Sequence, residues 1–477
     1  MKIKQDKGIT LIALVITIIV LLILAGVTIN ILTADNGILK QSNNAKKAND
    51  RSEFEEQVKL VVMSSKINTS SINLKMLETE LNKISGATIT KSTDDKLPWT
   101  VKKENYEITI TEEGTISNNT DESDEDSEIM KQARLAMPTG AYIDTNTNED
   151  TGIVMIDSNK NEWVWIEVPT TVFANATSST DYDNIKADLI AYVKDYTNSR
   201  YIDEWYAMDG ETLVTESTEG LTETQKLLNN GCGLTYSEYI RNYQTMLSSI
   251  YTNKGFYIGR YEAGIEGSDT DTNLARYSRT EITTSSPKAV SKKDMIPYNF
   301  VTCSDAQQLV NGMSTGNKTS SLMFGIQWDL VCKFLEEKGN WDTSTNTAQY
   351  YIKSNSTSWG NYRNSSITLA RGKYNITPSG PSSSSSVWTP FNTDTENYVM
   401  SCKTNNNTSY SQLLTTGASE NLKKINIYDL SGNVWEWTLE KMSGNYGPCT
   451  GRGGVYCYDG SSYPTSYRAR RKCNCLH

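Results

Sequence analysis

The sequence predicts an α+β protein in which a long apolar N-terminal helix precedes a small head and one large distal domain. Residues 9–29 form an apolar run without a charged side chain, long enough as a helix to cross ~30 Å of hydrocarbon. Residues 118–128 contain six acids and no apolar residue, so they cannot pack a core. From about Gly152 the chain is rich in Tyr, Trp, Asn and Ser, which predicts a separate globular domain.

A short leader, residues 1–8, precedes the apolar run and carries three lysines. A basic flank of this kind stays on the cytoplasmic side, so the rest of the chain should lie outside the membrane. A secretory signal has a shorter apolar core with its cleavage site behind it. We therefore expect the run to be retained, and Phe54, Val58 and Val62 at near-helical spacing extend the helix to residue 66.

Residues 8–12 read GITLI, and this junction resembles the cleavage site of type IV prepilins. The resemblance implies cutting by a prepilin peptidase between Gly8 and Ile9, N-methylation of Ile9, and other pilins as partners. Ala13 departs from the family, which usually has a glutamate there that pairs with a neighbouring subunit. Processing and anchoring are thus better supported than polymerisation, and a plain membrane anchor is the alternative.

The segment behind the long helix predicts a small head. Residues 74–84 favour a short helix, and residues 98–101 and 106–110 favour strands because apolar and β-branched residues alternate there. Residues 67–117 would then form a pilin-like α+β head. Residues 118–130 are predicted to be a solvated linker, since like charges keep such a segment extended. A calcium loop is the alternative, but the glycine and closing glutamate of an EF-hand are missing.

Composition excludes several functions. The formal net charge of −10 argues against nucleic acid as a partner, because such surfaces need clustered Lys and Arg. The single histidine is His477, which excludes Ser-His-Asp, Cys-His and multi-histidine zinc sites. The eight cysteines contain no CxxC pair, and we expect a mixture of buried thiols and disulfides whose pairing the sequence does not assign.

The distal part shows further regular elements. Residues 154–157 and 163–166 predict a hairpin, residues 255–262 an aromatic strand and residues 329–338 a short amphipathic helix. Two long polar stretches are predicted as surface loops: residues 343–386 and 393–408. Long loops on a rigid scaffold often carry function.

Near the C-terminus, residues 427–438 read IYDLSGNVWEWT, followed by RGGVY at 452–456 and SYR at 466–468. These motifs closely resemble the signature of the formylglycine-generating enzyme, or sulfatase-modifying factor, family, a variant of the C-type lectin fold. The resemblance covers about residues 150–470. It implies a C-type lectin-like domain over residues 150–477.

Carboxylates and carbonyls gather in the same motif, and oxygen-only ligands suit calcium. In the family a calcium ion sits at this turn. Carried over residue by residue, its ligands are the side chains of Asp429 and Glu436 and the carbonyls of Gly432 and Val434. The alternative is a buried, hydrogen-bonded carboxylate without a metal.

Catalysis in that family needs two cysteines that hold copper behind the paired glycines. Counted from Gly453 and Gly454, these positions are Tyr458 and Tyr463, and Cys457 lies one residue early. A soft metal has no site without paired thiolates. We therefore expect neither copper nor enzyme activity.

Tyr and Ser dominate residues 452–468, a composition typical of antibody binding loops. The segment resembles the variable region of target proteins diversified by retroelements, and an ordinary pair of aromatic strands is the alternative. The candidate ligand-binding residues are Trp435, Tyr456, Tyr458, Asp459, Ser461, Ser462, Tyr463 and Thr465.

The last residues, 469–477, read ARRKCNCLH and depart from the family, whose chain continues to a closing core strand. A shifted frame or truncation would remove that strand and leave an unpaired sheet edge.

Together these features predict a non-catalytic surface protein, membrane-anchored or pilus-associated. It would bind an unknown protein or glycan ligand on another cell or a phage. The alternatives are a minor pilin with a purely structural tip domain and, as a third reading, an oxidase of the formylglycine-generating type.

Overall fold

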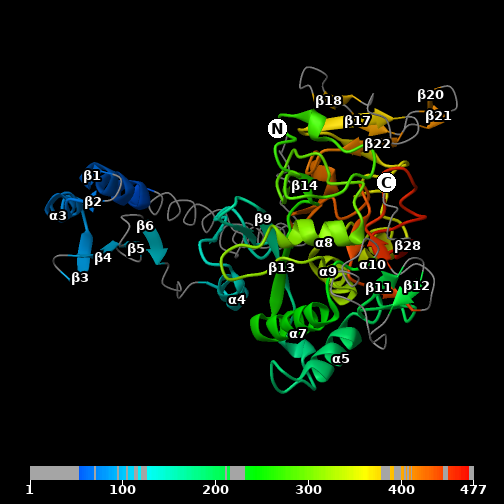
Figure 1. Cartoon of the computed structure of the whole chain (residues 1–477), viewed down its shortest axis with the longest axis horizontal. Helices are drawn as coiled ribbons and strands as arrows, with labels where there is room; N and C mark the ends of the chain where they lie inside the picture. Colours follow the sequence, from blue (N-terminus) through cyan, green and yellow to red (C-terminus); the bar gives the residue numbers. More distant parts are fainter. Residues whose placement is uncertain are drawn as a thin grey trace, which may run out of the picture. The chain divides into compact units, whose positions relative to one another are not determined.

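The computed structural model describes residues 53–471 apart from several short internal segments. The leader, the Gly8-Ile9 junction and the apolar run of residues 9–29 lie outside the described residues. The gaps are residues 69–70, 94–95, 104–105, 112–115, 120–125, 210–211, 215–230, 378–386, 392–398, 402–403, 406–407, 410 and 444–448. The chain forms two compact units, Met1–Asp126 and Ser127–His477 (Figure 1).

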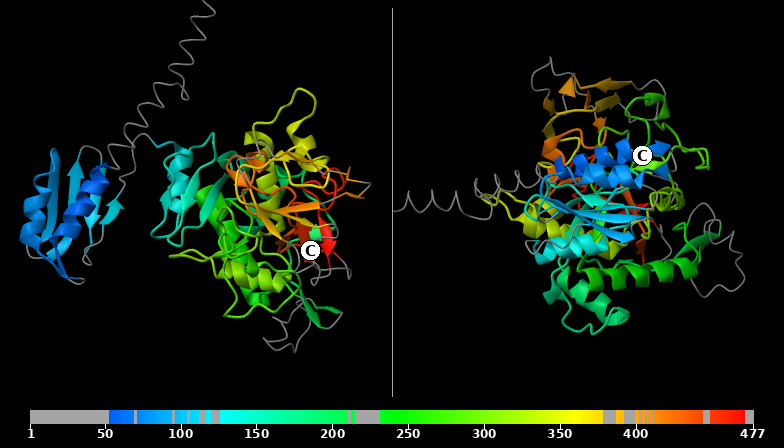
Figure 2. Two further views of the ribbon diagram at one scale, coloured as in Figure 1. Left: turned by 90° about the horizontal axis from the view of Figure 1, so that it is seen from above. Right: turned by 90° about the vertical axis from the view of Figure 1, so that its left-hand side faces the viewer.

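The first unit packs two helices on one face of an antiparallel sheet (Figure 2). Residues 53–65 are helical and bury Phe54, Val58 and Val62, because these positions share one helical face. In the sheet, alternate side chains of the second strand, including Trp99 and Val101, point into the same core. The elements are α3 (Leu74–Leu81), the short pair β1 (Lys66–Asn68) and β2 (Ser71–Ile72), and the meander β3 (Ala87–Thr93), β4 (Lys96–Lys103), β5 (Tyr106–Ile110) and β6 (Ile116–Asn119).

The predicted short helix at 74–84 and the two predicted strands are confirmed. The predicted fold class, an α+β chain organised around a long membrane-spanning pilin helix with a lectin-like domain behind it, is wrong. Within the described part of the chain, no helix is both long and apolar enough to cross a membrane. The described chain is instead a mixed α/β structure of helices and several small sheets.

The second unit begins with a four-stranded antiparallel sheet of order β13-β9-β8-β7. Helices α4 and α7 contact β13, and α9 contacts β9 (Figure 1). Val164 and Ile166 on β9 are fully buried in the main core. The strands are β7 (Tyr142–Ile143), β8 (Val154–Ile156), β9 (Glu162–Glu167) and β13 (Gly255–Gly259), and the helices are α4 (Glu128–Ala136), α5 (Tyr182–Tyr192), α7 (Tyr236–Asn253), α8 (Cys303–Asn311), α9 (Gly325–Lys338) and α10 (Ala348–Lys353).

Smaller sheets and short 3-10 helices complete the second unit. The paired strands are β10 (Tyr201–Ile202) with β26 (Lys441–Met442), β11 (Ala207–Asp209) with β12 (Thr212–Val214), β14 (Gly264–Ile265) with β15 (Ala289–Val290), β16 (Ser366–Thr368) with β19 (Val399–Ser401), β20 (Thr404–Asn405) with β21 (Thr408–Ser409), and β23 (Lys423–Lys424) with β24 (Ile427–Tyr428). The three-stranded sheets are β18 (Trp388–Pro390), β17 (Lys373–Thr377) and β22 (Ser411–Leu414), and β25 (Glu436–Thr438), β27 (Cys449–Arg452) and β28 (Ala469–Arg471). The 3-10 helices are η1 (Thr170–Val172), η2 (Thr272–Leu274) and η3 (Glu420–Leu422).

The structure confirms some local predictions in this unit and corrects others. The predicted hairpin is the pair β8 and β9, and the predicted helix at 329–338 is α9, which begins four residues earlier at Gly325. The stretch predicted as a loop at 343–386 contains α10, β16 and β17. At the C-terminal end, residues 469–471 form β28, which pairs with β27 and is the outermost strand of the sheet β25-β27-β28; residues 472–477 lie outside the described chain.

The helix of residues 53–65 offers a matched pair of truncations. Val58 is fully buried, whereas Leu60 is 58% exposed. We expect Val58→Ala to lower the free energy of unfolding by about 2 kcal/mol and Leu60→Ala, although it removes more atoms, to change it by less than about 0.5 kcal/mol. Amide hydrogen exchange of β4 and β5 would measure the stability of the first unit separately. Equal losses of stability in the two variants would contradict this packing.

Candidate functional site

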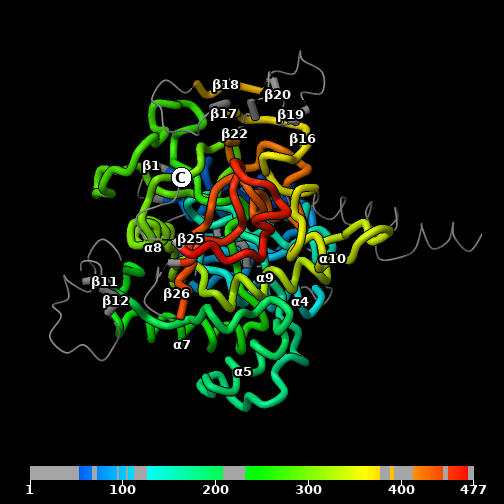
Figure 3. The backbone as a smooth tube through the Cα atoms, turned by 90° about the vertical axis from the view of Figure 1, so that its right-hand side faces the viewer, coloured from blue at the N-terminus to red at the C-terminus, as the bar shows by residue number. Residues whose placement is uncertain are grey.

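The Tyr- and Ser-rich segment lies between β27 and β28 as a series of turns, not as the strand pair considered from the sequence. It loops over the surface beside α10, as the red C-terminal part of Figure 3 shows. Three backbone hydrogen bonds hold it against residues 352–363. They run from Ser356 N to Gly460 O (3.1 Å), from Arg363 N to Tyr458 O (2.9 Å) and from Ser466 N to Ile352 O (3.1 Å).

Two glycines allow close backbone contacts around the segment, one within the segment itself and one between the 427–438 turn and Asn361. Gly454 has φ +88°, and a Cβ there would lie 2.5 Å from the Tyr463 carbonyl oxygen. Gly432 has φ +78°, and a Cβ there would lie 2.2 Å from the Asn361 carbonyl oxygen. Glycine adopts such a conformation with the least strain. Gly432 and Gly454 therefore allow the backbone to pack closely at these two points.

Two of the predicted ligand contacts are internal supports. Tyr456 is 2% exposed, and Thr465 is fully buried. The Thr465 hydroxyl lies 2.8 Å from Ser431 Oγ and 3.1 Å from Ser356 Oγ, and its carbonyl accepts a hydrogen bond from Trp328 Nε1 at 3.2 Å. The prediction that Tyr456 and Thr465 contact a ligand directly is corrected on this ground.

Five other predicted residues lie on the outer side of the segment, whereas the predicted contact Trp435 is buried, at 5% exposed, and packs against the Tyr463 ring. Tyr458, Ser461 and Ser462 are exposed, and Asp459 and Tyr463 are half-buried. The Tyr463 ring makes edge-to-face contacts with the rings of Tyr458 (centroids 4.8 Å apart) and Trp435 (5.4 Å apart).

Sequence reasoning missed two residues of this surface. Tyr467, 40% exposed, contacts the Tyr463 ring edge-to-face with centroids 4.9 Å apart; it had been read only as part of the family motif. Arg363 forms an ion pair with Asp459 at 3.0 Å. No sequence signal connects Arg363 to this surface, because it lies far away in the chain. We define the aromatic surface as Tyr458, Tyr463 and Tyr467; the rings of Tyr463 and Tyr467 pack against the buried Trp435.

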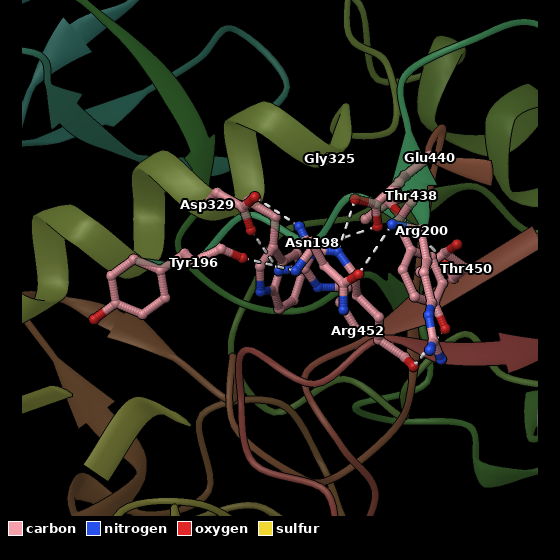
Figure 4. Close-up of polar contacts among 12 residues, drawn as sticks. Tyr196, Asn198, Arg200, Gly325, Asp329, Thr438, Glu440, Thr450 and Arg452 are labelled. Carbon is pink, nitrogen blue, oxygen red and sulfur yellow. Dashed lines mark hydrogen bonds and ion pairs between the residues drawn. The ribbon is translucent and has the colours of Figure 1, made fainter. Parts of the chain in front are cut away.

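Four buried ionic side chains fix both ends of the segment. Arg452, at the end of β27, contacts Asp329 of α9 and Glu440 (Figure 4). Arg468, just before β28, contacts the same two carboxylates. The nitrogen–oxygen distances are 2.8 and 3.3 Å for Arg452 and 2.6 and 2.8 Å for Arg468. Arg452 is completely buried. Two cations therefore share two anions in a closed ring, which we call the ionic ring.

A third acid lies next to the ionic ring. The Asp203 carboxylate accepts hydrogen bonds from the N–H groups of Gly325 (2.6 Å) and Ile326 (3.0 Å), so it occupies the N-terminus of α9. Burial, and next the charge of Glu440, raise the pKa of Asp203 to about 7 despite these two donors. The two positive and two negative charges of the ionic ring cancel each other, so the ring does not neutralise an ionised Asp203.

The four residues predicted to bind calcium all lie within the turn of residues 429–436. Asp429 is fully buried; its Oδ2 accepts the Gly417 N–H at 2.6 Å, and its Oδ1 has no hydrogen-bond partner among the described residues. Burial raises the pKa of Asp429 to about 7 and that of Glu436 to about 8. The carbonyl oxygens of Gly432 and Val434 belong to the same turn.

Within the described chain, no group of three or more His, Cys, Asp or Glu side chains is arranged to hold a metal ion. A calcium ion at this turn would therefore depend on Asp429 and Glu436 together with backbone carbonyls. Calcium stays a prediction.

The buried cysteines are poor nucleophiles. Burial raises the pKa of Cys232 to about 11 and those of Cys303 and Cys332 to about 12, and all three are free thiols. Cys457, considered from the sequence as a displaced copper ligand, lies in a turn and is half-buried. Thiolate chemistry at neutral pH is therefore disfavoured at the first three positions.

Comparison of the chain with protein-family models, with curated proteins and with solved structures finds no match. The resemblance to prepilins, to formylglycine-generating enzymes and to retroelement-diversified proteins therefore stays a prediction from the motifs.

The ionic ring predicts a large difference between two arginine truncations. Arg452→Ala would leave Asp329 and Glu440 buried with only one cation, and we expect a loss of about 3–5 kcal/mol in the free energy of unfolding. Arg363→Ala removes a partly exposed ion pair and should cost less than about 1 kcal/mol. Urea unfolding of both variants would measure this, and similar losses would contradict the ring's structural role.

Asp203 predicts a dependence of stability on pH. Its folded-state pKa of about 7 lies above the unfolded value of ~3.9, so the folded state binds the extra proton between these values. Stability should therefore fall as pH rises from about 4 to about 7. In Asp203→Asn this fall should shrink by on the order of 1–3 kcal/mol. Urea unfolding at several pH values tests it, and an unchanged slope would refute this role of Asp203.

Proposed function

We propose that the second unit is a non-catalytic ligand-binding module whose contact surface is formed by Tyr458, Asp459, Ser461, Ser462 and Tyr463. The observation that carries the proposal is the aromatic surface, in which the Tyr463 ring packs against the rings of Tyr458, Tyr467 and the buried Trp435 with centroids 4.8 to 5.4 Å apart. Tyrosines supply large amphipathic contact area at a low entropic cost, and neighbouring serines supply adaptable hydrogen bonds.

The support below this surface favours binding without rearrangement. The ionic ring fixes both ends of the segment, and Thr465 ties its middle to Ser356 and Ser431. A preorganised surface loses little conformational freedom when a ligand binds. Mechanical support and ligand contact are thus assigned to different side chains.

This separation also fits diversification of the segment. Substitutions at exposed positions such as Tyr458, Ser461 and Ser462 change stability little, whereas changes at the buried Arg452 or Thr465 would disturb the fold. A variable region could therefore alter its outer residues and keep its supports. Anchoring of the protein at the cell surface through the apolar run of residues 9–29 remains part of the proposal.

The proposal assigns no catalytic role to the segment. Tyr458 and Tyr463, which occupy the positions of the copper-binding cysteines in the resembling family, contact each other through their rings. Phenol rings in edge-to-face contact offer contact area, and thiolates at these positions would have offered a soft-metal site.

Binding can be tested with immobilised defined glycans and purified cell-surface proteins as ligands for the full chain. We expect Tyr458→Ala and Tyr463→Ala each to weaken binding of any recognised ligand by about tenfold or more, because central aromatic residues carry most interface energy. The matched control is Tyr142→Ala: Tyr142 is 47% exposed against 43% for Tyr458 but lies on β7. Unchanged binding in both test variants, or an equal loss in the control, would refute the proposal.

A further inference from the structure

Strand β13 lies at one edge of the four-stranded sheet and pairs with β9 alone. The hydrogen bond from Arg260 N to Glu162 O, at 2.9 Å, continues this ladder by one residue beyond β13. Because every second pair of an antiparallel ladder is hydrogen-bonded, the even-numbered residues of β13 bond to β9. The main-chain N–H and C=O groups of Gly255, Tyr257 and Gly259 therefore point away from β9, toward the free edge.

These outward groups border a cavity. They have no main-chain partner among the described residues, and all five residues of β13 line a cavity of about 1120 Å³. Since glycine has no side chain, Gly255 and Gly259 line it only with main-chain atoms. An unpaired strand edge of this kind is a template for a further strand.

Helix α7 and the loop between α8 and α9 supply another part of the lining. The loop is fixed at its tip, where a Cβ on Gly316 would lie 2.9 Å from the N and O atoms of Thr139. The cavity is therefore bounded by a helix and an attached loop as well as by β13. A single extended chain needs only ~4.8 Å of width in a sheet, which favours it over the edge of a second folded copy.

Hydroxyl and amide side chains are frequent in these two segments of the lining. They include Asn242, Thr245 and Ser248 from α7, and Ser314, Thr315 and Ser320 from the loop. Hydroxyl and amide groups both donate and accept hydrogen bonds, so they suit the polar side chains of a bound chain.

The charges of the lining favour an acidic chain. The basic side chains, Arg241 and Lys318, are both exposed, so the cavity reaches the surface at these residues. The three acids of the lining, Glu238, Glu262 and Glu436, are half-buried or buried. The exposed charges around the cavity are thus positive, and they complement acidic side chains.

We propose that this cavity binds an extended, acidic peptide segment of a partner protein, which adds to the sheet as a further strand beside β13. Main-chain hydrogen bonds to the outward groups of β13 supply affinity, and acidic side chains pair with Arg241 and Lys318. β13 has five residues, so a segment of similar length, ~17 Å when extended, matches it. The site goes beyond the Tyr458 surface, because its described lining contains no residue of 452–468.

The full chain can be titrated by isothermal calorimetry with the peptide Asp-Thr-Val-Thr-Val-Asp, which has strand-forming residues between acidic ends. The charge control replaces both Asp residues of the peptide by Lys. We expect saturable binding of the acidic peptide and affinity lower by about tenfold or more for the Lys peptide. The double variant Arg241→Gln with Lys318→Gln should abolish this preference.

Two substitutions of Tyr257 form a matched pair. Tyr257→Pro and Tyr257→Ala both remove the phenol and its hydrogen bond to Ala133 O, but only proline also removes the outward N–H, which β9 does not use. We expect Tyr257→Pro to bind the acidic peptide about tenfold more weakly than Tyr257→Ala.

Should Tyr257→Pro fail to fold by circular dichroism, N-methylation of the peptide provides the same comparison with the wild-type protein. Alternate peptide N–H groups face β13 or face away from it. Methylation of one alternate set should therefore abolish binding, and methylation of the other set should leave it.

Three results would overturn the proposal. The first is the absence of saturable binding of the acidic peptide to the wild type. The second is equal affinity in folded Tyr257→Pro and Tyr257→Ala, or for the two methylated peptides. The third is a dimer of the full chain in analytical ultracentrifugation that Tyr257→Pro dissociates, which would assign the edge to a second copy. None of these results bears on the Tyr458 surface, whose test uses other ligands and other variants.

Discussion

The ionic ring is the constraint on which the architecture of the second unit depends. Removing two arginines and two acids from water is expensive, and the cost is offset only when every charge has close partners. Here each guanidinium contacts both carboxylates, and the partners come from α9, from β27 and from the residues beside β25 and β28. The ring therefore joins a central helix to both ends of the C-terminal segment, and neither end can shift without exposing an unpaired buried charge.

This attachment explains why a segment made of turns can present an ordered surface. Between Arg452 and Arg468 the chain has little regular structure, yet Thr465 and the backbone of Gly460 are fixed to the loop that follows α10. Tyr463 then has only one region to occupy, between Trp435 and Tyr467. Buried contacts thus order the backbone of the segment. The outer side chains are not needed for this and can differ in chemistry.

The parts of the fold that could be predicted were those encoded locally. Alternation of buried and outward residues revealed the β8–β9 hairpin, and a helical stripe revealed the helix at 53–65 and most of α9. The predicted overall class is wrong because it makes an apolar run that lies outside the described residues the organising element of the fold. The supposed loop at 343–386 contains α10 and two strands, since short elements stabilised by distant partners have weak local patterns. Within the candidate site, the aromatic composition singled out residues 452–468, but composition cannot separate Tyr458, which is exposed, from Tyr456, which is buried. The contacts of Arg363 and of Glu262 join residues that are far apart in sequence, so no local pattern could reveal them.

The two groups of buried acids in this unit differ in whether they have basic partners. Asp329 and Glu440 are balanced by Arg452 and Arg468 inside the fold, so the ionic ring is complete without any further partner. Glu262 and Glu436 line a cavity whose basic residues are exposed, and Glu262 keeps one oxygen unpaired. Folding alone selects for balanced charges, because an uncompensated buried carboxylate only destabilises the native state. A chain that already balances two acids with arginines therefore has a ready means of balancing the others. The unpaired oxygens of Glu262 and Asp429 are closed to solvent, so the cost of burying them falls on the native state, and the ionic ring is the part of this core that offsets such a cost internally.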